Sequence, residues 1–488
     1  MVNDIVHPNR DCHEPSREPG SYRDPTGYIF YHNNDVYRFI CDDELVFFEG
    51  VIDSDMFRSF VADRQIVNTE MIEPAPGDQV RQHLPETVSK ILKHERIEYI
   101  SYPYEWSFSM CIDAALLTLT LQASLLRHQL TLKDASPFNI QFQGALPIFI
   151  DIASISRVSQ TGIWSAYNQF CQFWLYPLLM YHRGIDDLRS IYVSNIDGIK
   201  LDDVKRLLGT WPLWRFGFFI DYFLPMLFSK SKRINDRIAD GITLPERDNS
   251  ADIQGLTVRR LTRNIRRLAT YRPRGHWVEY VSTCSYSDEN EERKAHLIED
   301  FLDREQVTSL LDIGCNTGRF ATLAATRGIE VVAIDSDMDC VEQLYTRARA
   351  EKLNILPLCA DITNPSPAIG WDNCERQSLL NRLHSKFDCV FALALVHHLL
   401  VTKRVPVEYF AMLERDLTRQ FLITEFVGRD DAKFRQLLRY RSESYDYYDL
   451  DFFREIHAKH FEILDEIILT DEETRMDRAI FLMRKLPT

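Results

Sequence analysis

The stretch Leu310-Leu-Asp-Ile-Gly-Cys-Asn-Thr-Gly-Arg-Phe320 decides the fold of this 488-residue chain, because an apolar strand runs there into a glycine loop and then into a helix. Gly314 and Gly318 have no Cβ, so the backbone can turn sharply and approach a ligand closely at these positions. Ligands of open α/β sheets bind beyond the carboxyl ends of the strands, which is where this loop lies. The stretch therefore predicts a binding site for an adenine-containing cofactor.

Around this stretch, residues 285–488 alternate apolar strands with helices, as the βαβ units of a parallel sheet do. The short polar stretch Thr470–Asp477 joins the last two strands, so these two should form an antiparallel hairpin. We expect a Rossmann-like α/β sheet of seven strands, at Ser309–Ile313, Glu330–Ile334, Ile355–Leu358, Phe387–Leu393, Gln420–Glu425, Phe461–Leu469 and Ala479–Arg484.

Two acids at the ends of later strands complete the predicted cofactor site. Val331-Val-Ala-Ile-Asp335 is an apolar strand that ends in a carboxylate, which can accept hydrogen bonds from both ribose hydroxyls. Leu358-Cys-Ala-Asp361 ends the next strand in the same way. A dinucleotide site would share the glycine loop and the first acid. The spacing Gly-x-x-x-Gly, together with the antiparallel end of the sheet, favours S-adenosylmethionine (SAM), which has no phosphate to bind.

This set of residues resembles the cofactor site of class I SAM-dependent methyltransferases, where an acid in the place of Asp361 usually holds the adenine amino group. Asn316 departs from the pattern, because many relatives have a glycine there, but Asn also accepts a positive φ. The residues that the resemblance assigns to SAM are Asp312, Gly314, Cys315, Asn316, Gly318, Asp335, Ser336, Asp361 and Ile362.

A long irregular segment, residues 362–376, lies between the third and fourth predicted strands. Loops at the carboxyl edge of such a sheet commonly carry binding residues. Trp371, Glu375 and Arg376 are therefore candidate contacts for the methyl acceptor. The alternative is a loop that only caps the sheet, with Trp371 in a local core.

The fourth strand continues into Leu393-Ala-Leu-Val-His397-His398, which places two imidazoles beside the expected acceptor. A neutral imidazole can remove a proton from an attacking hydroxyl or amine. The alternative is that one histidine bonds to the backbone and the other packs. Glu425, at the end of the fifth strand, is a second candidate base, or else a solvated strand end. A base is optional, because positioning an already activated methyl donor can supply about 7–11 kcal/mol.

A second constellation lies in the first half of the chain. Asp134 and Asn139 are spaced Asp-x4-Asn, and an apolar strand that begins at Pro147 ends in Asp151. This pattern resembles the catalytic loop and the metal-binding acid of protein-kinase-like phosphotransferases. A predicted helix over residues 111–128 and a hinge-like stretch, Glu98–Trp106, precede it in the order that such a fold requires.

The same region departs from that pattern in its first residues. Short β-rich runs, Tyr28–Tyr31 and Leu45–Phe48, suggest the strands of a small lobe, but no lysine precedes Lys90 and no glycine-rich phosphate loop occurs. Transfer from ATP would then lack much of its charge neutralisation. We interpret residues 27–199 as a degenerate kinase-like α+β module, with an active but divergent phosphotransferase or an unrelated α/β domain as the alternatives.

Composition limits the remaining possibilities. Residues 1–26 are polar and lack the apolar core of a signal peptide, which predicts a flexible leader, and residues 200–284 predict a helical extension and connector. A net charge of −15 disfavours nucleic acid as a partner. Ten cysteines without a CxxC pair predict a cytoplasmic protein with no structural metal. The apolar stretch Trp211–Phe228 contains Arg215 and Asp221, so it predicts a buried or interface helix and no membrane span.

Taken together, Ser101–Trp106, Leu132–Asn139, Asp312–Gly318, Asn364–Pro367, Gly370-Trp371, Glu375-Arg376 and His397-His398-Leu resemble a group of bacterial methyltransferases that includes host-specific nodulation proteins. The resemblance implies transfer of a methyl group from SAM to an O or N acceptor, which the first module helps to select. It makes a glycan or another small molecule the acceptor to test. A phosphotransferase fused to a methyltransferase and a non-catalytic SAM-binding interaction protein are the alternatives, and the sequence leaves the oligomeric state open.

Overall fold

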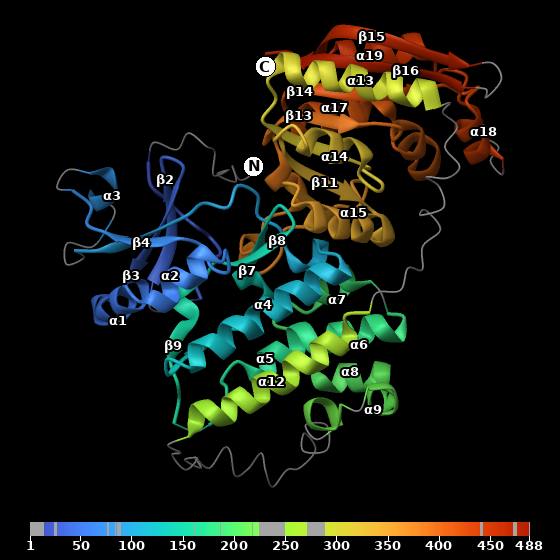
Figure 1. Cartoon of the computed structure of the whole chain (residues 1–488). Coiled ribbons are helices and arrows are strands. Elements are labelled where there is room, and N and C mark those ends of the chain that lie inside the picture. Colours follow the sequence, from blue (N-terminus) through green and yellow to red (C-terminus); the bar gives the residue numbers. More distant parts are fainter. Residues whose placement is uncertain are drawn as a thin grey trace.

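The computed structural model describes residues 14–23, 27–75, 78–82, 84, 89–160, 162–185, 187–216, 218–223, 249–270, 288–439, 443–471 and 476–487. Within these residues an N-terminal sheet and a large helical region precede a second sheet, which is covered by its own helices (Figure 1). Parts of the predicted leader (1–13 and 24–26) and of the predicted connector (224–248 and 271–284) lie outside the described residues.

The C-terminal sheet confirms the predicted strands. In the described residues it has seven strands in the order β12-β11-β10-β13-β14-β16-β15. The first five are parallel, and β10 lies between β11 and β13, so the direction of strand succession reverses between β10 and β13. Their bounds are β10 Ser309–Ile313, β11 Glu330–Asp335, β12 Ile355–Cys359, β13 Phe387–Ala392 and β14 Thr418–Val427. Such a reversal is the place where open α/β sheets bind their ligands.

The last two strands, β15 (Phe461–Asp471) and β16 (Met476–Lys485), pair antiparallel as predicted. β16 also pairs antiparallel with β14, which closes this side of the sheet. The helices that cover the sheet are α13 Asp288–Glu305, α14 Arg319–Ala325, α15 Met338–Glu351, α16 Leu379–Leu383, α17 Val407–Leu417, α18 Ala432–Leu438 and α19 Leu450–Ala458, with short turns η7 Trp371–Asn373 and η8 His398–Lys403.

The N-terminal sheet has the order β1-β2-β3-β5-β4 in the described residues, and all its neighbours are antiparallel. The predicted strand at Tyr28–Tyr31 is confirmed as part of β2. The prediction of a flexible leader is wrong in part, because two of its residues form β1 and pair with β2. The elements are β1 Ser16–Arg17, β2 Gly27–His32, β3 Asp35–Ile40, α1 Asp42–Ile52, α2 Asp55–Ala62, β4 Thr69–Ile72, α3 Gln79–Gln82 and β5 Ile91–His94.

The predicted β-rich run at Leu45–Phe48 is wrong, because these residues lie in helix α1. Three acids occupy the first turn of this helix, where the positive end of the helix dipole favours them. Leu45, Phe48 and Val51 recur every third residue and form its buried face. Helical spacing over the whole segment therefore prevails over the β propensity of a four-residue run.

The helical region is built around α4 (Phe108–Leu126), which confirms the predicted helix at 111–128. α12 (Ser250–Leu268), which was predicted as part of the connector, packs along α4 and so belongs to the same module (Figure 1). The other elements are η1 Pro103–Glu105, β6 Leu130–Leu132, η2 Pro137–Asn139, β7 Ile140–Gln143, β8 Leu146–Phe149, η3 Ile152–Ser154, β9 Ile155–Arg157, α5 Tyr167–Phe170, η4 Cys171–Leu175, α6 Tyr176–Arg183, α7 Leu188–Ser194, α8 Leu201–Leu208, α9 Trp211–Phe216 and η5 Phe219–Phe223.

Among the described residues, α4 is also the one helix that is long and apolar enough to cross a membrane. Most of its apolar stretch is buried inside the molecule, and the buried residues lie all around the helix. A helix that is apolar on every face is typical of the centre of a large core. α4 is therefore the core helix of the N-terminal module.

The two modules share one hydrophobic core and a buried ion pair. α15 packs against α4, and β12 lies next to η1. Arg382 of α16 pairs with Glu105 of η1, and both side chains are almost fully buried. Ser366 donates a hydrogen bond to Glu105 (2.6 Å), and Tyr345 of α15 donates one to Asp113 of α4 (2.7 Å). These contacts hold α15 and the segment after β12 against the N-terminal module.

Candidate active site

The glycine loop has the conformation that a close ligand contact requires. Gly314 and Gly318 have φ values of 74° and 76°, and Asn316 has a φ of 51°. The prediction that Asn316 can take the place of a glycine by adopting a positive φ is confirmed. The backbone N–H of Gly314 donates to the carbonyl of Ile334 in β11 (2.9 Å), which ties the loop to the neighbouring strand. The loop therefore lies at the carboxyl ends of β10 and β11.

Asp335, at the end of β11, faces this loop. Its carboxylate accepts one hydrogen bond from the backbone N–H of Asn316 (2.8 Å) and one from that of Asp337 (2.9 Å). Burial raises its pKa, and these backbone donors oppose the rise. A carboxylate has about four lone-pair sites, so two bonds leave it able to accept more. The group is thus fixed in place at the position that suits a ribose.

Asp312 lies on β10 itself and is buried. Burial and the neighbouring carboxylate of Asp335 raise its pKa to about 7, and the ammonium group of Lys294 opposes the rise. SAM is a cation at its sulfonium centre, so an ionised Asp312 suits it. Together with the turn at Gly314 and the fixed Asp335, this acid shows that the residues present fit SAM.

The raised pKa of Asp312 gives a testable pH dependence. Below about pH 7 the free protein holds a proton on this carboxyl, and a bound cation favours its ionised form. SAM binding should therefore release protons, and its affinity should rise between about pH 5.5 and 7 and then level off. Calorimetry in two buffers of different ionisation enthalpy measures the released protons. Asp312→Asn should abolish the pH dependence, and a wild-type affinity that is flat over this range would contradict the assignment.

The remaining predicted cofactor residues line the same edge of the sheet. Cys315 and Ile362 are buried, and Ser336 directly follows Asp335. Asp361 follows β12, where its carboxylate accepts a hydrogen bond from Lys403 of η8 (2.8 Å). Burial raises the pKa of Asp361, but the bonds from Lys403 and Thr363 outweigh burial and leave the pKa lowered. Asp361 is therefore ionised and is tied to the segment that begins with the two histidines.

His397 and His398 follow β13, with ring centroids 4.2 Å apart. His397 is buried, and neither of its ring nitrogens has a hydrogen-bond partner among the described residues. Burial and the charges of Arg478 and Lys433 lower the pKa of both rings, that of His398 to about 4. Both imidazoles are therefore neutral at pH 7. His398 is the less buried of the two.

Glu425 is buried and paired, so the prediction that it acts as a catalytic base is wrong. The structure buries its carboxylate completely and pairs it with Lys294 and Arg478. The same carboxylate accepts the backbone N–H of Ala394 (3.0 Å), in the turn after β13. A fully buried carboxylate with these three partners is not open to an acceptor. The sequence analysis missed Lys294, because a lysine in the strongly charged segment 288–305 gives no signal that its side chain points inward.

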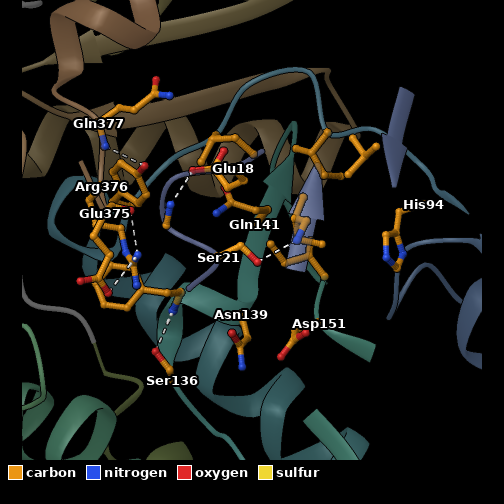
Figure 2. Close-up of a pocket in the computed structure, with 18 of the residues that line it drawn as sticks. Glu18, Ser21, His94, Ser136, Asn139, Gln141, Asp151, Glu375, Arg376 and Gln377 are labelled. Carbon is orange, nitrogen blue, oxygen red and sulfur yellow. Dashed lines mark hydrogen bonds and ion pairs between the residues drawn. The ribbon is translucent and has the colours of Figure 1, made fainter. Parts of the chain in front are cut away.

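The predicted acceptor residues Glu375 and Arg376 face the N-terminal module (Figure 2). Glu375 accepts hydrogen bonds from Tyr22 (2.9 Å) and Arg23 (3.0 Å), which belong to the predicted leader. Burial raises the pKa of Glu375, but the bonds from Arg23 and Tyr22 and the charge of Arg376 leave it lowered. Trp371 is about three-quarters exposed, so the alternative that it packs in a local core is wrong. The structure does not bring these residues into direct contact with His397 or His398.

Glu375 and Arg376 line a cavity of about 910 Å³ together with residues of the N-terminal module. Figure 2 shows Asn139 and Asp151 on the other side of this cavity. Asp134 lines the cavity as well. Burial, and to a smaller extent the negative charge of Asp151, raises the pKa of Asp134. The three residues of the kinase-like pattern therefore lie together, as that pattern requires.

Arg38 of β3 is a cation of the first strands that contacts this group of residues. Its guanidinium donates to one carboxylate oxygen of Asp151 (2.7 Å), and Ser154 donates to the other (2.5 Å). Asn139 in turn donates to Ser154 (3.1 Å). The kinase pattern predicts a lysine in these strands, so nothing in the sequence singled out Arg38. Among the residues that the structure describes, no group of three or more His, Cys, Asp or Glu side chains is arranged to hold a metal ion.

Comparisons with known proteins agree with this geometry. Residues 259–459 match the methyltransferase domain family. With the reversal of strand order, the glycine loop and the two fixed acids, this match shows that this part of the chain is a SAM-dependent methyltransferase domain, with SAM as its cofactor.

The chain is similar to the nodulation protein NoeA of Rhizobium meliloti (strain 1021), with 29% identity over 442 residues, which is 90% of each chain. Solved structures with some likeness include the bifunctional kinase-methyltransferase WbdD and a magnesium protoporphyrin IX methyltransferase. WbdD has 18% identity and a TM-score of 0.30, over 42% of this chain and 41% of that one. The second, ChlM from Synechocystis PCC 6803 with bound SAH, has 15% identity and a TM-score of 0.30, over 40% and 83%.

Proposed function

We propose that the enzyme transfers the methyl group of SAM to a hydroxyl or amine, with His398 as the base that takes the proton of the acceptor. The observation that carries this proposal is the neutral His397–His398 pair in the turn after β13, beside the reversal of strand order. SAM supplies an activated methyl group. Asp335 and Asp312 hold and orient the donor, and the less buried ring of His398 receives the proton at a nitrogen. His397 packs behind it.

Replacing His398 by Gln tests this role. We expect the turnover number to fall by roughly 10²-fold or more, since general-base catalysis contributes factors of this size. The affinity for SAM, measured by calorimetry, should stay the same because the cofactor residues are untouched. His460→Gln, just before β15 and at the end of the sheet opposite the carboxyl ends of the parallel strands, is the matched control. Unchanged turnover in His398→Gln would show that positioning alone drives the reaction.

We further propose that the acceptor is a glycan or another small polar molecule. The support is the segment 362–376, whose Glu375 and Arg376 line the cavity together with Asn139 and Gln141. Carboxylate, guanidinium and amide groups of this kind suit a ligand with many hydroxyls. The test is transfer of labelled methyl from SAM into fractionated oligosaccharides and metabolites. Tight SAM binding without labelling of any fraction would instead favour a non-catalytic SAM-binding interaction protein.

A second candidate function is phosphotransfer by the N-terminal module. The observation in its favour is that Asp134, Asn139, Asp151 and Arg38 line one cavity. On this proposal the full-length protein hydrolyses ATP in the presence of magnesium, and Asp151→Ala abolishes the hydrolysis without changing SAM affinity. Absence of magnesium-dependent hydrolysis in the wild-type protein would exclude this function and leave the cavity as a binding site.

A further inference from the structure

Lys294 is a charged residue on the buried face of α13. Ile298 and Phe301 lie four and seven residues further along the helix, so they share a face with Lys294, and both are fully buried. Phe301 packs edge-on against Phe421 of β14 (5.4 Å between centroids), which seats the helix on the sheet. The side chain of Lys294 is only 3% exposed. Among the side chains of this helix that the structure describes, Glu292, Arg293 and Asp300 are exposed, as are Asp303 and Arg304. A buried ammonium group is costly unless it has partners.

The partners of Lys294 come from both sides of β13. Its ammonium group forms an ion pair with Glu425 of β14, and its charge acts on Asp312 of β10. β10 and β14 are the two neighbours of β13 in the sheet. Lys294 therefore bridges the carboxyl end of β13, beside the reversal of strand order where the cofactor is placed.

Through Glu425, this ammonium group also holds the turn that carries the histidines. The Glu425 carboxylate accepts the backbone N–H of Ala394, whose φ of 49° is unusual for a residue with a Cβ. Arg478 of β16 donates to the same carboxylate (3.1 Å) and to Asp431 (2.8 Å). A backbone in this region persists only where its surroundings fix it. Lys294 and Arg478 supply the charge balance that keeps the Glu425 acceptor buried.

We propose that Lys294 is a positioning residue of the SAM site, whose ammonium group fixes Glu425 and the Ala394 turn and balances the charge of Asp312. The inference rests on the placement of SAM at the glycine loop and is independent of the acceptor. The titratable groups whose charges act on Asp312 or respond to it are Asp335 of β11, Cys315 of the loop and Lys294 of α13, and Lys294 is the cation among them.

The test is the pH profile of SAM affinity, measured by calorimetry on the full chain between about pH 6 and 9. Lys294→Met removes the cation that favours ionised Asp312, so the midpoint of the profile should move up by about one pH unit. Affinity at pH 7 should then fall by up to about tenfold and recover at the alkaline end. Lys294→Arg should keep most of the affinity. A role in stability alone would lower the unfolding temperature without moving this midpoint.

The controls separate this inference from the cofactor placement and from misfolding. Glu291→Gln breaks another contact of the same helix, the ion pair with Arg319 (2.5 Å), and should leave the profile unchanged. The double variant Lys294→Met with Glu425→Gln removes both buried charges together, so it should fold even if Lys294→Met alone does not. The midpoint of its pH profile should move up by the same amount as that of Lys294→Met. A midpoint at the wild-type position in that folded double variant would overturn the inference. Unchanged affinity in Asp335→Ala would instead overturn the placement of SAM.

Discussion

Asp335→Ala is expected to lower the affinity for SAM by roughly 100- to 1000-fold. Two hydrogen bonds from ribose hydroxyls to an ionised acceptor contribute about 3–4 kcal/mol together. The substitution also removes the acceptor of the Asn316 and Asp337 backbone N–H groups (2.8 and 2.9 Å), so the glycine loop loses one of its contacts with β11. Isothermal titration with SAM measures the effect directly.

Two further variants test whether the loss of SAM affinity in Asp335→Ala comes from the missing carboxylate. Asp335→Asn keeps the shape and one acceptor oxygen, so it should bind SAM more weakly than the wild type and more tightly than Asp335→Ala. Glu330→Gln changes an acid at the opposite end of the same strand and should have the affinity of the wild type. If all three variants bind SAM equally well, the cofactor is bound elsewhere.

Arg382→Met is expected to destabilise the whole protein by about 3–5 kcal/mol, which is the usual cost of leaving one member of a buried ion pair without its partner. Arg382 donates to Glu105 (3.0 Å) and to the carbonyl of Ile100 (2.7 Å), and its guanidinium lies 4.5 Å from the Tyr102 ring centroid. Loss of the cation would leave the Glu105 carboxylate buried at the junction of the two modules. Urea unfolding followed by circular dichroism measures the change in stability.

The double variant Arg382→Met with Glu105→Leu removes both charges and should recover a large part of the lost stability. Arg404→Met breaks an exposed pair with Glu443 (2.7 Å) and should change stability by less than about 1 kcal/mol. A cost for Arg382→Met as small as that of Arg404→Met would show that the junction between the modules is not a structural contact in solution.

The sequence was most informative where burial and backbone geometry agree. The strands β10, β11 and β12 are short, mainly apolar runs, and Gly314 and Gly318 occupy positions with positive φ. Local signals of this kind need no knowledge of distant contacts. The strand predicted at Leu45–Phe48 was wrong because four residues are too few to show a helical period. The spacing of Leu45, Phe48 and Val51 shows the helix only over the longer segment.

The missed residues are those whose role depends on the tertiary fold. Lys294, Arg38 and Arg382 are ordinary cations in the sequence, and only the packing of α13, β3 and α16 brings them to their acidic partners. Glu425 was wrong as a base for the same reason, because the two cations that hold it are 131 and 53 residues away. The spacing of residues within a sequence motif cannot predict ion pairs between residues so far apart in the chain.

The contact between Tyr22 and Glu375 has a consequence for how the chain is made. The two residues are 353 positions apart, so at synthesis rates of about 5–20 residues per second the partner emerges roughly 20–70 s after the tyrosine. Glu105 is likewise synthesised well before its partner Arg382, which lies 277 positions later in the chain. The N-terminal part therefore leaves the ribosome with its future docking groups exposed to solvent, and it can complete its surface only when the second part has been translated.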